Sequence, residues 1–107
     1  YRTYTENDGW EAWSENGEIN GEPDGTRRLE AIQIRLTGKA AEKYDIYYRV
    51  HCQDDGWLGW AKNGEKAGSE GYSRRMEAIE IRLVAKGQSL SGGEKTSFAV
   101  NPNSKLM

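Results

Sequence analysis

Two pairs of tryptophans, each flanked by carboxylate and amide side chains, are the part of this sequence best suited to binding chemistry. Trp13 follows Trp10 by three residues, and Trp60 follows Trp57 by three residues. The C–H face of a sugar ring can stack on an exposed indole while polar neighbours bond to its hydroxyl groups. Trp13 and Trp60 are the predicted stacking residues. The predicted polar contacts are an Asp, an Asn and a Glu near each pair: Asp8, Asn16 and Glu18, and Asp55, Asn63 and Glu65.

The spacing of each pair predicts which tryptophan faces solvent. Side chains alternate between the two faces of a strand, so residues three apart lie on opposite faces. Small residues accompany Trp10 and Trp57, which places these two rings in the core, whereas the face of Trp13 and Trp60 is largely charged and at least partly exposed. A bulge between the two rings would cancel this assignment. The alternative, in which all four rings are core residues, stays open.

The tryptophan pairs belong to an internal repeat. Residues 1–36 align with residues 48–83 without a gap, at a constant offset of 47, and 18 of the 36 aligned positions are identical. Self-similarity at a fixed period is typical of duplicated structural units. The sequence therefore predicts two copies of one unit.

The alternating side chains and the turn residues of each copy predict β-structure. Residues 45–53 alternate between apolar and polar side chains, and so do residues 29–36 and 76–83 toward the end of each copy. Asn16-Gly17 and Asn63-Gly64 are the pairs preferred in type I′ hairpins, because both central residues need positive φ. Helix-favouring residues make a helix over residues 27–35 an alternative, but the period-two alternation favours a strand. Glycine-rich loops are expected over residues 21–25 and 68–71.

Composition excludes several classes of protein. Leu, Ile, Val and Phe together number 16, whereas there are four Trp and six Tyr, so the core must draw on aromatic rings. A net charge of −2 with no basic block argues against binding nucleic acid through its phosphate backbone. The sequence has no apolar run of about 20 residues, so no membrane span is expected.

An enzyme is not expected. His51, the single histidine, corresponds to Tyr4 in the first copy, which excludes a repeated histidine-based site. Cys52 corresponds to Thr5 and lies on the apolar side of its strand, where an inert buried thiol is expected. No Ser/His/Asp or metal-ligand spacing is present, so neither a cofactor nor a metal is predicted. Arg28 and Glu30, repeated as Arg75 and Glu77, are interpreted as structural: a cross-strand ion pair, or a link from Glu30 to a loop backbone.

The repeated motif resembles the ChW repeat, the clostridial hydrophobic repeat with a characteristic tryptophan. The residues that carry the resemblance are Gly9, Trp10, Trp13, Gly17, Glu18, Gly21, Arg28, Glu30, Ala31, Ile32, Ile34 and Leu36, with Gly56, Trp57, Trp60, Gly64, Glu65, Gly68, Arg75, Glu77, Ala78, Ile79, Ile81 and Leu83 in the second copy. The loop at residues 22–26 departs from the small residues that are usual there. The resemblance implies an extracellular or cell-surface protein of a Gram-positive bacterium, with a binding role toward polysaccharide or protein.

We therefore expect an all-β fold in which two copies of a unit of 47 residues pack with pseudo-symmetry, as a sandwich or as a β-prism or trefoil-like arrangement. The first repeat, which lacks the opening residues of its first strand, spans residues 1–47 with its linker, and the second spans residues 48–87. A Ser/Gly loop, a closing strand over residues 96–100 beside the start of the first copy, and a frayed tail make up residues 88–107. Because the sequence starts at Tyr1, we expect a segment of a longer chain.

Two functions are compatible with these expectations. The first is a non-catalytic module that recognises polysaccharide or cell-wall glycan at a bacterial surface, since two copies of a weak site raise avidity. The alternative is a protein–protein interaction or structural spacer repeat, for which a large exposed apolar patch would be the signature.

Overall fold

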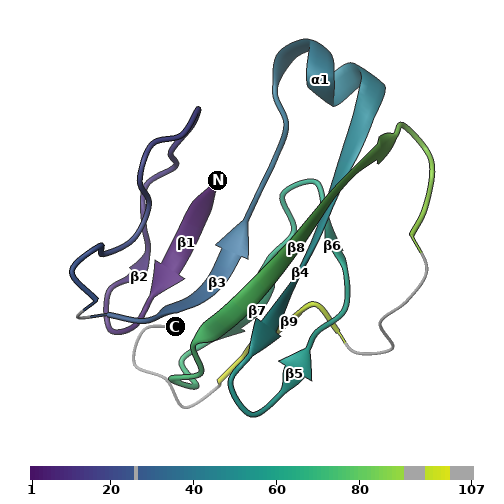
Figure 1. Cartoon of the computed structure of the whole chain (residues 1–107). Helices are drawn as coiled ribbons and strands as arrows, with labels where there is room; N and C mark the ends of the chain where they lie inside the picture. Colours follow the sequence, from purple (N-terminus) through teal and green to yellow (C-terminus); the bar gives the residue numbers. More distant parts are fainter. Residues whose placement is uncertain (26, 91–95, 102–107) are drawn as a thin grey trace.

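The computed structural model describes residues 1–25, 27–90 and 96–101, and it is built almost entirely from β-strands (Figure 1). In chain order the elements are β1 (Arg2–Thr5), β2 (Gly9–Trp10), β3 (Leu29–Gln33), α1 (Gly38–Lys43), β4 (Tyr44–Cys52), β5 (Gly56–Trp57), β6 (Ala61–Lys62), β7 (Ala67–Glu70), β8 (Met76–Ala85) and β9 (Phe98–Val100). The predicted all-β class with two tandem copies is confirmed.

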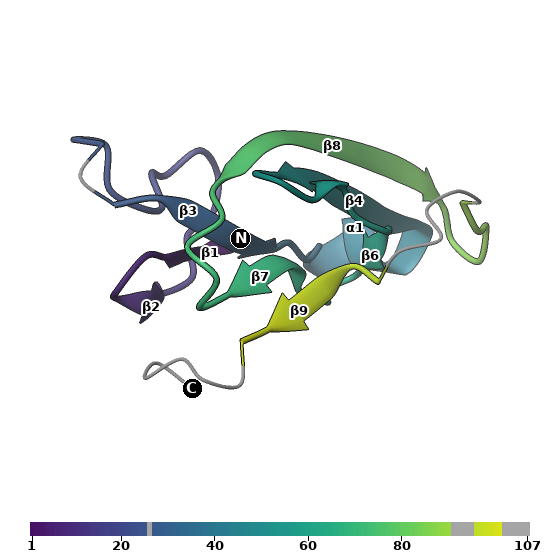
Figure 2. The ribbon, with the colours of Figure 1, turned by 90° about the horizontal axis from the view of Figure 1, so that it is seen from below.

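The strands form two open sheets. One sheet has the order β2-β1-β3-β7-β9, and in the other β4 pairs with β8 along one edge and with β5 and β6 along the opposite edge. Figure 2 shows β4 and β8 in a layer above β3, β7 and β9. The sheets are not closed, and their arrangement in two layers matches the sandwich-like alternative rather than the β-prism or trefoil-like one.

The two copies share a strand plan, and the second copy has two further strands, β6 and β7, at positions where the first copy has none. At the offset of 47, β1, β2 and β3 correspond to β4, β5 and β8. β7 belongs to the second copy but joins the sheet of the first, pairing antiparallel with β3 so that Gly68 lies opposite Ala31 and Ala67 opposite Ile32. The copies are therefore interlocked rather than arranged as two separate units.

Both Asn-Gly pairs form the predicted turns. Asn16 and Gly17 have φ of 52° and 84°, and Asn63 and Gly64 have φ of 46° and 87°, as a type I′ turn requires. In each copy a tyrosine at the equivalent position seals this turn: the hydroxyl of Tyr1 donates to the carbonyl oxygen of Glu18, and that of Tyr48 to the carbonyl oxygen of Glu65.

The core lies between the two copies. The apolar side of β4 is buried and packs against the apolar side of β3 and the residues after its end, with Ala67 of β7 joining from the side. The buried members of this cluster are Ile34, Ile46, Tyr48, Val50, Cys52, Leu58, Ala61 and Ala67. The first copy therefore buries its apolar side against the second copy.

Three details differ from the expectations for the ends and connections. β9 pairs in parallel with β7, not with the start of the first copy, because the outer edge of β7 is available there. The linker between the copies contains a helical turn and a half, α1, and the second glycine-rich loop is largely the strand β7. The predicted tail over residues 101–107 lies, apart from Asn101, outside the described residues. In the described residues no helix has the length and apolarity that a membrane crossing needs.

We expect Gly68→Ala to destabilise the fold strongly. Gly68 has φ of 116°, and a Cβ there would collide with the carbonyl oxygen of Glu30 and lie 2.7 Å from the Cα of Ala31. Backbone strain of about 1 kcal/mol would add to overpacking of about 1–3 kcal/mol. Urea unfolding measures the sum. Gly17→Ala is the matched control, because φ is also positive there but nothing lies within 4 Å of the added Cβ; equal losses in both variants would contradict the close approach of β7 to β3.

Candidate functional site

Each copy carries a stack of alternating aromatic rings and arginines on the side of the sheet opposite its isoleucines. In the second copy the guanidinium of Arg49 lies 4.9 Å from the ring centroid of Trp57 and 4.8 Å from that of Trp60. Arg82 stands 6.0 Å from Trp60, and His51 meets Trp57 edge to face. We call this set of residues, His51, Trp57, Arg49, Trp60 and Arg82, the second ladder.

The first copy repeats the arrangement at the equivalent positions. Arg2 lies 5.0 Å from the centroids of both Trp10 and Trp13, and Arg35 lies 4.2 Å from that of Trp13. Tyr4 meets Trp10 edge to face, as His51 meets Trp57. These residues, Tyr4, Trp10, Arg2, Trp13 and Arg35, form the first ladder. An arginine over an indole is attracted by the ring quadrupole, and the contact is effective even at exposed sites.

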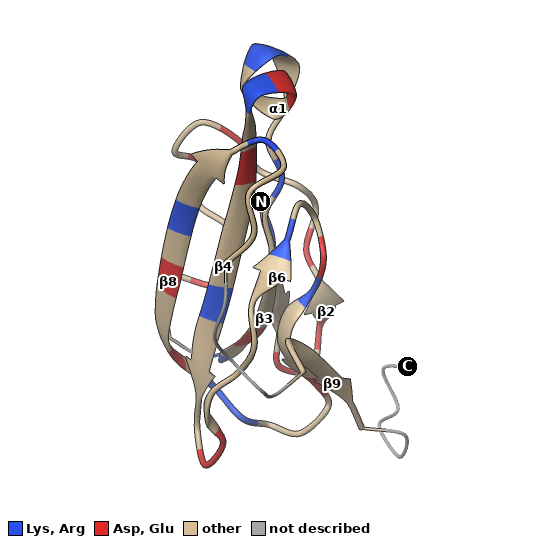
Figure 3. Ribbon diagram, turned by 90° about the vertical axis from the view of Figure 1, so that its right-hand side faces the viewer, with Lys and Arg blue, Asp and Glu red and all other residues tan. Residues whose placement is uncertain are grey.

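A third side chain in each copy fixes the arginine between its two rings. Arg2 Nε donates to Gln33 Oε1 at 2.6 Å, and at the equivalent position Arg49 Nε donates to Glu80 Oε1 at 2.8 Å. Arg82 Nε also donates to Glu80. These hydrogen bonds, of which the one from Arg49 has the largest effect, hold the pKa of Glu80 below its usual value. Figure 3 shows the resulting basic and acidic positions close together on β4 and β8.

The ladders correct the prediction for Trp10 and Trp57. Both rings were expected in the core, but Trp57 is 40% exposed and Trp10 is half-buried. The strand continues for only two residues, and the chain leaves it after Trp57, so that Leu58 occupies the core and both tryptophans lie against the same arginine. The predicted partial exposure of Trp13 and Trp60 is confirmed, with Trp13 at 37% and Trp60 half-buried.

A pocket of about 340 Å³ opens beside Trp13. Its wall includes Trp13, Tyr1 and Arg35, and polar groups come from Asn16 and from Thr37, which precedes α1. The Asn16-Gly17 turn and the connection into α1 hold these groups at the rim. An aromatic wall with a few convergent polar groups is the usual composition of a ligand site. Of the predicted contacts, the structure brings Trp13 and Asn16 together here.

The other predicted polar contacts are engaged within the fold. Asp8 pairs with Arg27, and Asp55 pairs with Arg74 at 2.7 Å, which closes the turn after β1 and β4 in the same way. Glu18 and Glu65 each accept a hydrogen bond from the backbone N–H three residues earlier, at 2.9 and 2.8 Å. Of the eight predicted contact residues, Trp13 and Asn16 line the pocket, Trp60 belongs to the second ladder, and the others make contacts within the fold.

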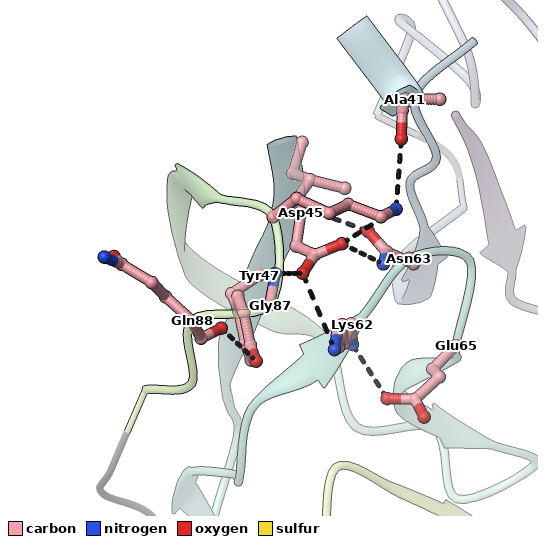
Figure 4. A network of polar contacts seen from close by, with 10 residues as sticks. Ala41, Asp45, Tyr47, Lys62, Asn63, Glu65, Gly87 and Gln88 are labelled. Carbon is pink, nitrogen blue, oxygen red and sulfur yellow. Dashed lines mark hydrogen bonds and ion pairs between the residues drawn. The ribbon is translucent and has the colours of Figure 1, made fainter. Parts of the chain in front are cut away.

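Asn63 belongs to a polar network around the buried carboxylate of Asp45 that the sequence did not predict (Figure 4). Asn63 Nδ2 donates to Asp45 Oδ1 at 2.9 Å, and Asn63 Oδ1 accepts from the backbone N–H of Ile46. The N–H of Gly87 donates to Asp45 Oδ2 at 3.0 Å, and Lys86 Nζ lies 3.2 Å from Asp45 Oδ1 while donating to the carbonyl oxygen of Ala41. The carboxylate therefore ties a hairpin turn, the end of β8 and α1 to the start of β4.

The remaining titratable residues singled out from the sequence have structural surroundings. Burial of Cys52 against the core raises the pKa of its thiol to about 11, as expected for an inert thiol. Glu30 is 1% exposed, and its carboxylate accepts from the backbone of Gly71 and Ser73, as the loop-link interpretation predicted; burial raises its pKa. Among the described residues, no three His, Cys, Asp or Glu side chains are grouped so that they could hold a metal ion.

Sequence reasoning missed the arginines, although a signal was available. Arg2 and Arg35 recur as Arg49 and Arg82 at the repeat offset, as the tryptophans do. Two identical arginines per copy beside two identical tryptophans could have indicated stacking.

Replacing Arg49 by Met should destabilise the second ladder. The substitution keeps the length of the side chain but removes the cation that two indoles share, together with its ion pair to Glu80, and we expect a loss of about 1–2 kcal/mol in the free energy of unfolding. Urea titration followed by tryptophan fluorescence measures this loss. Arg75→Met is the control, because Arg75 makes a surface ion pair with Glu77 and should cost less than about 0.5 kcal/mol. Equal effects at the two positions would show that the ladder adds nothing.

The network around Asp45 predicts a dependence of stability on acidic pH. Hydrogen bonds to the carboxylate, of which the one from Asn63 has the largest effect, hold the pKa of Asp45 far below its ordinary value. The stabilisation is therefore complete above the unfolded-state pKa of about 4 and is lost as the pH falls toward the folded-state value. Asp45→Asn should be less stable than the parent at pH 7 and lose less stability between about pH 4 and pH 2. Asp54→Asn, at an exposed position, serves as the control; parallel pH profiles for the parent and Asp45→Asn would contradict this account.

Comparison with known proteins identifies the repeat. The family described as "Clostridial hydrophobic W" (ChW) matches residues 4–38 and again residues 51–85. Searches of curated proteins and of solved structures returned no match. The two matched segments cover most of the chain and are related by the same offset of 47 that relates the two copies. The chain belongs to the ChW family and consists of two tandem ChW repeats.

Proposed function

We propose that this chain is a non-catalytic binding module that recognises polysaccharide or cell-wall glycan outside the cell, at the surface of a Gram-positive bacterium and as part of a longer multidomain protein. The observation that supports the proposal is the pocket beside Trp13, where a partly exposed indole stands among hydrogen-bonding side chains. This is the arrangement that a sugar ring needs, because its C–H face stacks and its hydroxyl groups bond at the edges.

The contacts around Trp13 indicate how a sugar would enter. Arg35 stacks on the indole and is itself exposed, so its side chain can leave the ring with little loss of packing. A sugar ring takes the place of the guanidinium on the indole, and the displaced donors reach the sugar's hydroxyl or carboxylate oxygens. Asn16 and Thr37 offer further polar groups at the rim. The proposed site is therefore in the first copy.

A second candidate function, a structural or protein-interaction repeat, is favoured by a separate observation. Ile81 and Leu83 on β8 are 53% and 54% exposed and lie on one side of the strand with Ile79. Contiguous apolar groups of this kind on a protein surface are typical of interaction sites.

The glycan proposal predicts different effects for equivalent tryptophans. Trp13→Ala should weaken binding to the recognised glycan at least tenfold, because it removes the wall of the pocket, whereas Trp60→Ala should leave the affinity within about twofold. The two substitutions remove equivalent tryptophans from the two ladders, so a general effect on folding would appear in both variants. A glycan array identifies the ligand, and titration with co-sedimentation on purified Gram-positive cell walls measures the affinity.

Two results would contradict this proposal. One is the absence of any bound glycan on the array and on the cell walls for the folded parent chain. The other is an equal loss of affinity in Trp13→Ala and Trp60→Ala, which would place the contact outside the pocket.

A further inference from the structure

The apolar side of β3 is covered in the first copy, whereas the equivalent side of β8 in the second copy is exposed. Ile34 is 9% exposed because it packs on the apolar side of β4, whereas its counterpart Ile81 is 53% exposed. Leu36 packs against the same cluster, whereas its counterpart Leu83 is 54% exposed. The residue types are the same at these positions, so the difference comes from the neighbouring unit: the second copy covers the first.

The edges of the two strands show the same contrast. β3 has a neighbour on each side, β1 and β7. β8 pairs with β4 along one edge, and along its other edge no strand of the described residues pairs with it. Figure 2 shows β8 as the outermost strand of its layer. A ten-residue strand with an open edge and exposed isoleucines is a template for pairing with another segment.

Arg28 and Glu30 also differ from their counterparts in the second copy in what they contact. Arg28 Nη1 donates to the carbonyl oxygen of Ser73 at 3.1 Å, and Glu30 binds the backbone of the same loop, so both hold the second copy against the first. Their counterparts Arg75 and Glu77 lie on the surface, where they pair with each other. The groups that the first copy uses here to hold the second are thus repeated, and exposed, on the second copy.

We propose that the open edge and apolar side of β8 form a docking surface for a further ChW repeat. A strand of the β7 type in that repeat pairs along β8, with its glycine opposite Ala78 and the preceding residue opposite Ile79, as Gly68 and Ala67 pair with β3. A strand of the β4 type covers Ile79, Ile81 and Leu83. Arg75 and Glu77 hold the loop after the β7-type strand.

The occupant must be a repeat of the second type. The covering positions in the second copy are apolar, whereas the first copy has hydrogen-bonded polar residues there. Thr3 Oγ1 donates to Asn20 Oδ1 at 2.6 Å, Thr5 Oγ1 donates to Glu11 Oε1 at 3.0 Å, and Asn20 Nδ2 donates to Ser14 Oγ at 2.8 Å. Their counterparts in the second copy are Val50, Cys52, Leu58, Ala61 and Ala67. The polar groups of the first copy are therefore satisfied by hydrogen bonds within that copy, as in the capping unit of a repeat array. For this reason, we do not expect a second molecule to dock on β8 through its first repeat.

Inserting a second copy of residues 41–87 directly after Gly87 in the full chain tests the proposal, because it keeps the spacing of 47 residues. Hydrogen exchange of the amides of residues 79–83 in the original β8 is compared between the parent and the insertion variant. We expect exchange to slow by on the order of 100-fold on insertion. A matched control carries Gly68→Val in the inserted repeat alone, where the added side chain would prevent pairing along β8, and there the protection should be lost.

Three outcomes are distinguishable. The proposal is supported if the amides of β8 are protected in the insertion variant and exposed in its Gly68→Val control. It is overturned if exchange from β8 is unchanged while the inserted repeat shows protected amides in its own β4. It is also overturned if sedimentation shows that the parent chain dimerises and that Ile81→Glu abolishes the dimer, since β8 would then serve a second copy of the chain.

Discussion

The packing of one repeat on the next is the interaction on which the rest of this structure depends. A single ChW unit forms a narrow sheet whose isoleucine side has nothing of its own to cover it, and Ile34 is buried only because β4 of the second copy lies across it. The same contact brings β7 against β3 so closely that a side chain at position 68 would meet the backbone. Burial of Glu30 between the copies is a consequence, since its carboxylate then has loop amides to accept from.

The opposite side of each sheet is stabilised by a different kind of interaction, which explains a composition that is poor in aliphatic residues. An Arg shared between two Trp rings orders an exposed surface without needing a second layer of protein over it, because cation–π attraction acts on groups that stay in contact with water. The aliphatic side chains that are buried, such as Ile34, Val50 and Leu58, lie between the copies. The hydrogen bonds that fix Arg2 through Gln33 and Arg49 through Glu80 keep both stacks in place although only half of the aligned residues are identical.

The sequence predicted what local chemistry determines and missed what tertiary contacts determine. The repeat, the Asn-Gly turns and the alternating strands follow from spacing and from backbone preference, and all three are confirmed. The assignment of Trp57 to the core failed because it assumed an unbroken strand, whereas the chain leaves the strand after two residues and buries Leu58. Ala67–Glu70 has little intrinsic preference for β-structure and becomes a strand only because β3 and β9 lie on either side of it. The pocket depends on how α1 lies beside the first turn, which no local pattern encodes.

The positions at which the copies differ are informative because the identical positions already account for the shared fold. The tryptophans, the ladder arginines and the turn residues are the same in both, so each copy can build the unit. The inner positions differ in one direction: Thr3, Thr5 and Asn20 have polar partners within the first copy, and the second copy has apolar residues there that need a neighbour. A change of this kind favours a directional association, because an apolar inner side needs a preceding repeat to pack on, whereas a polar inner side finds its partners within its own repeat. The first copy can therefore begin a stack and expose a pocket, whereas the second copy both covers its predecessor and presents β8 for another repeat.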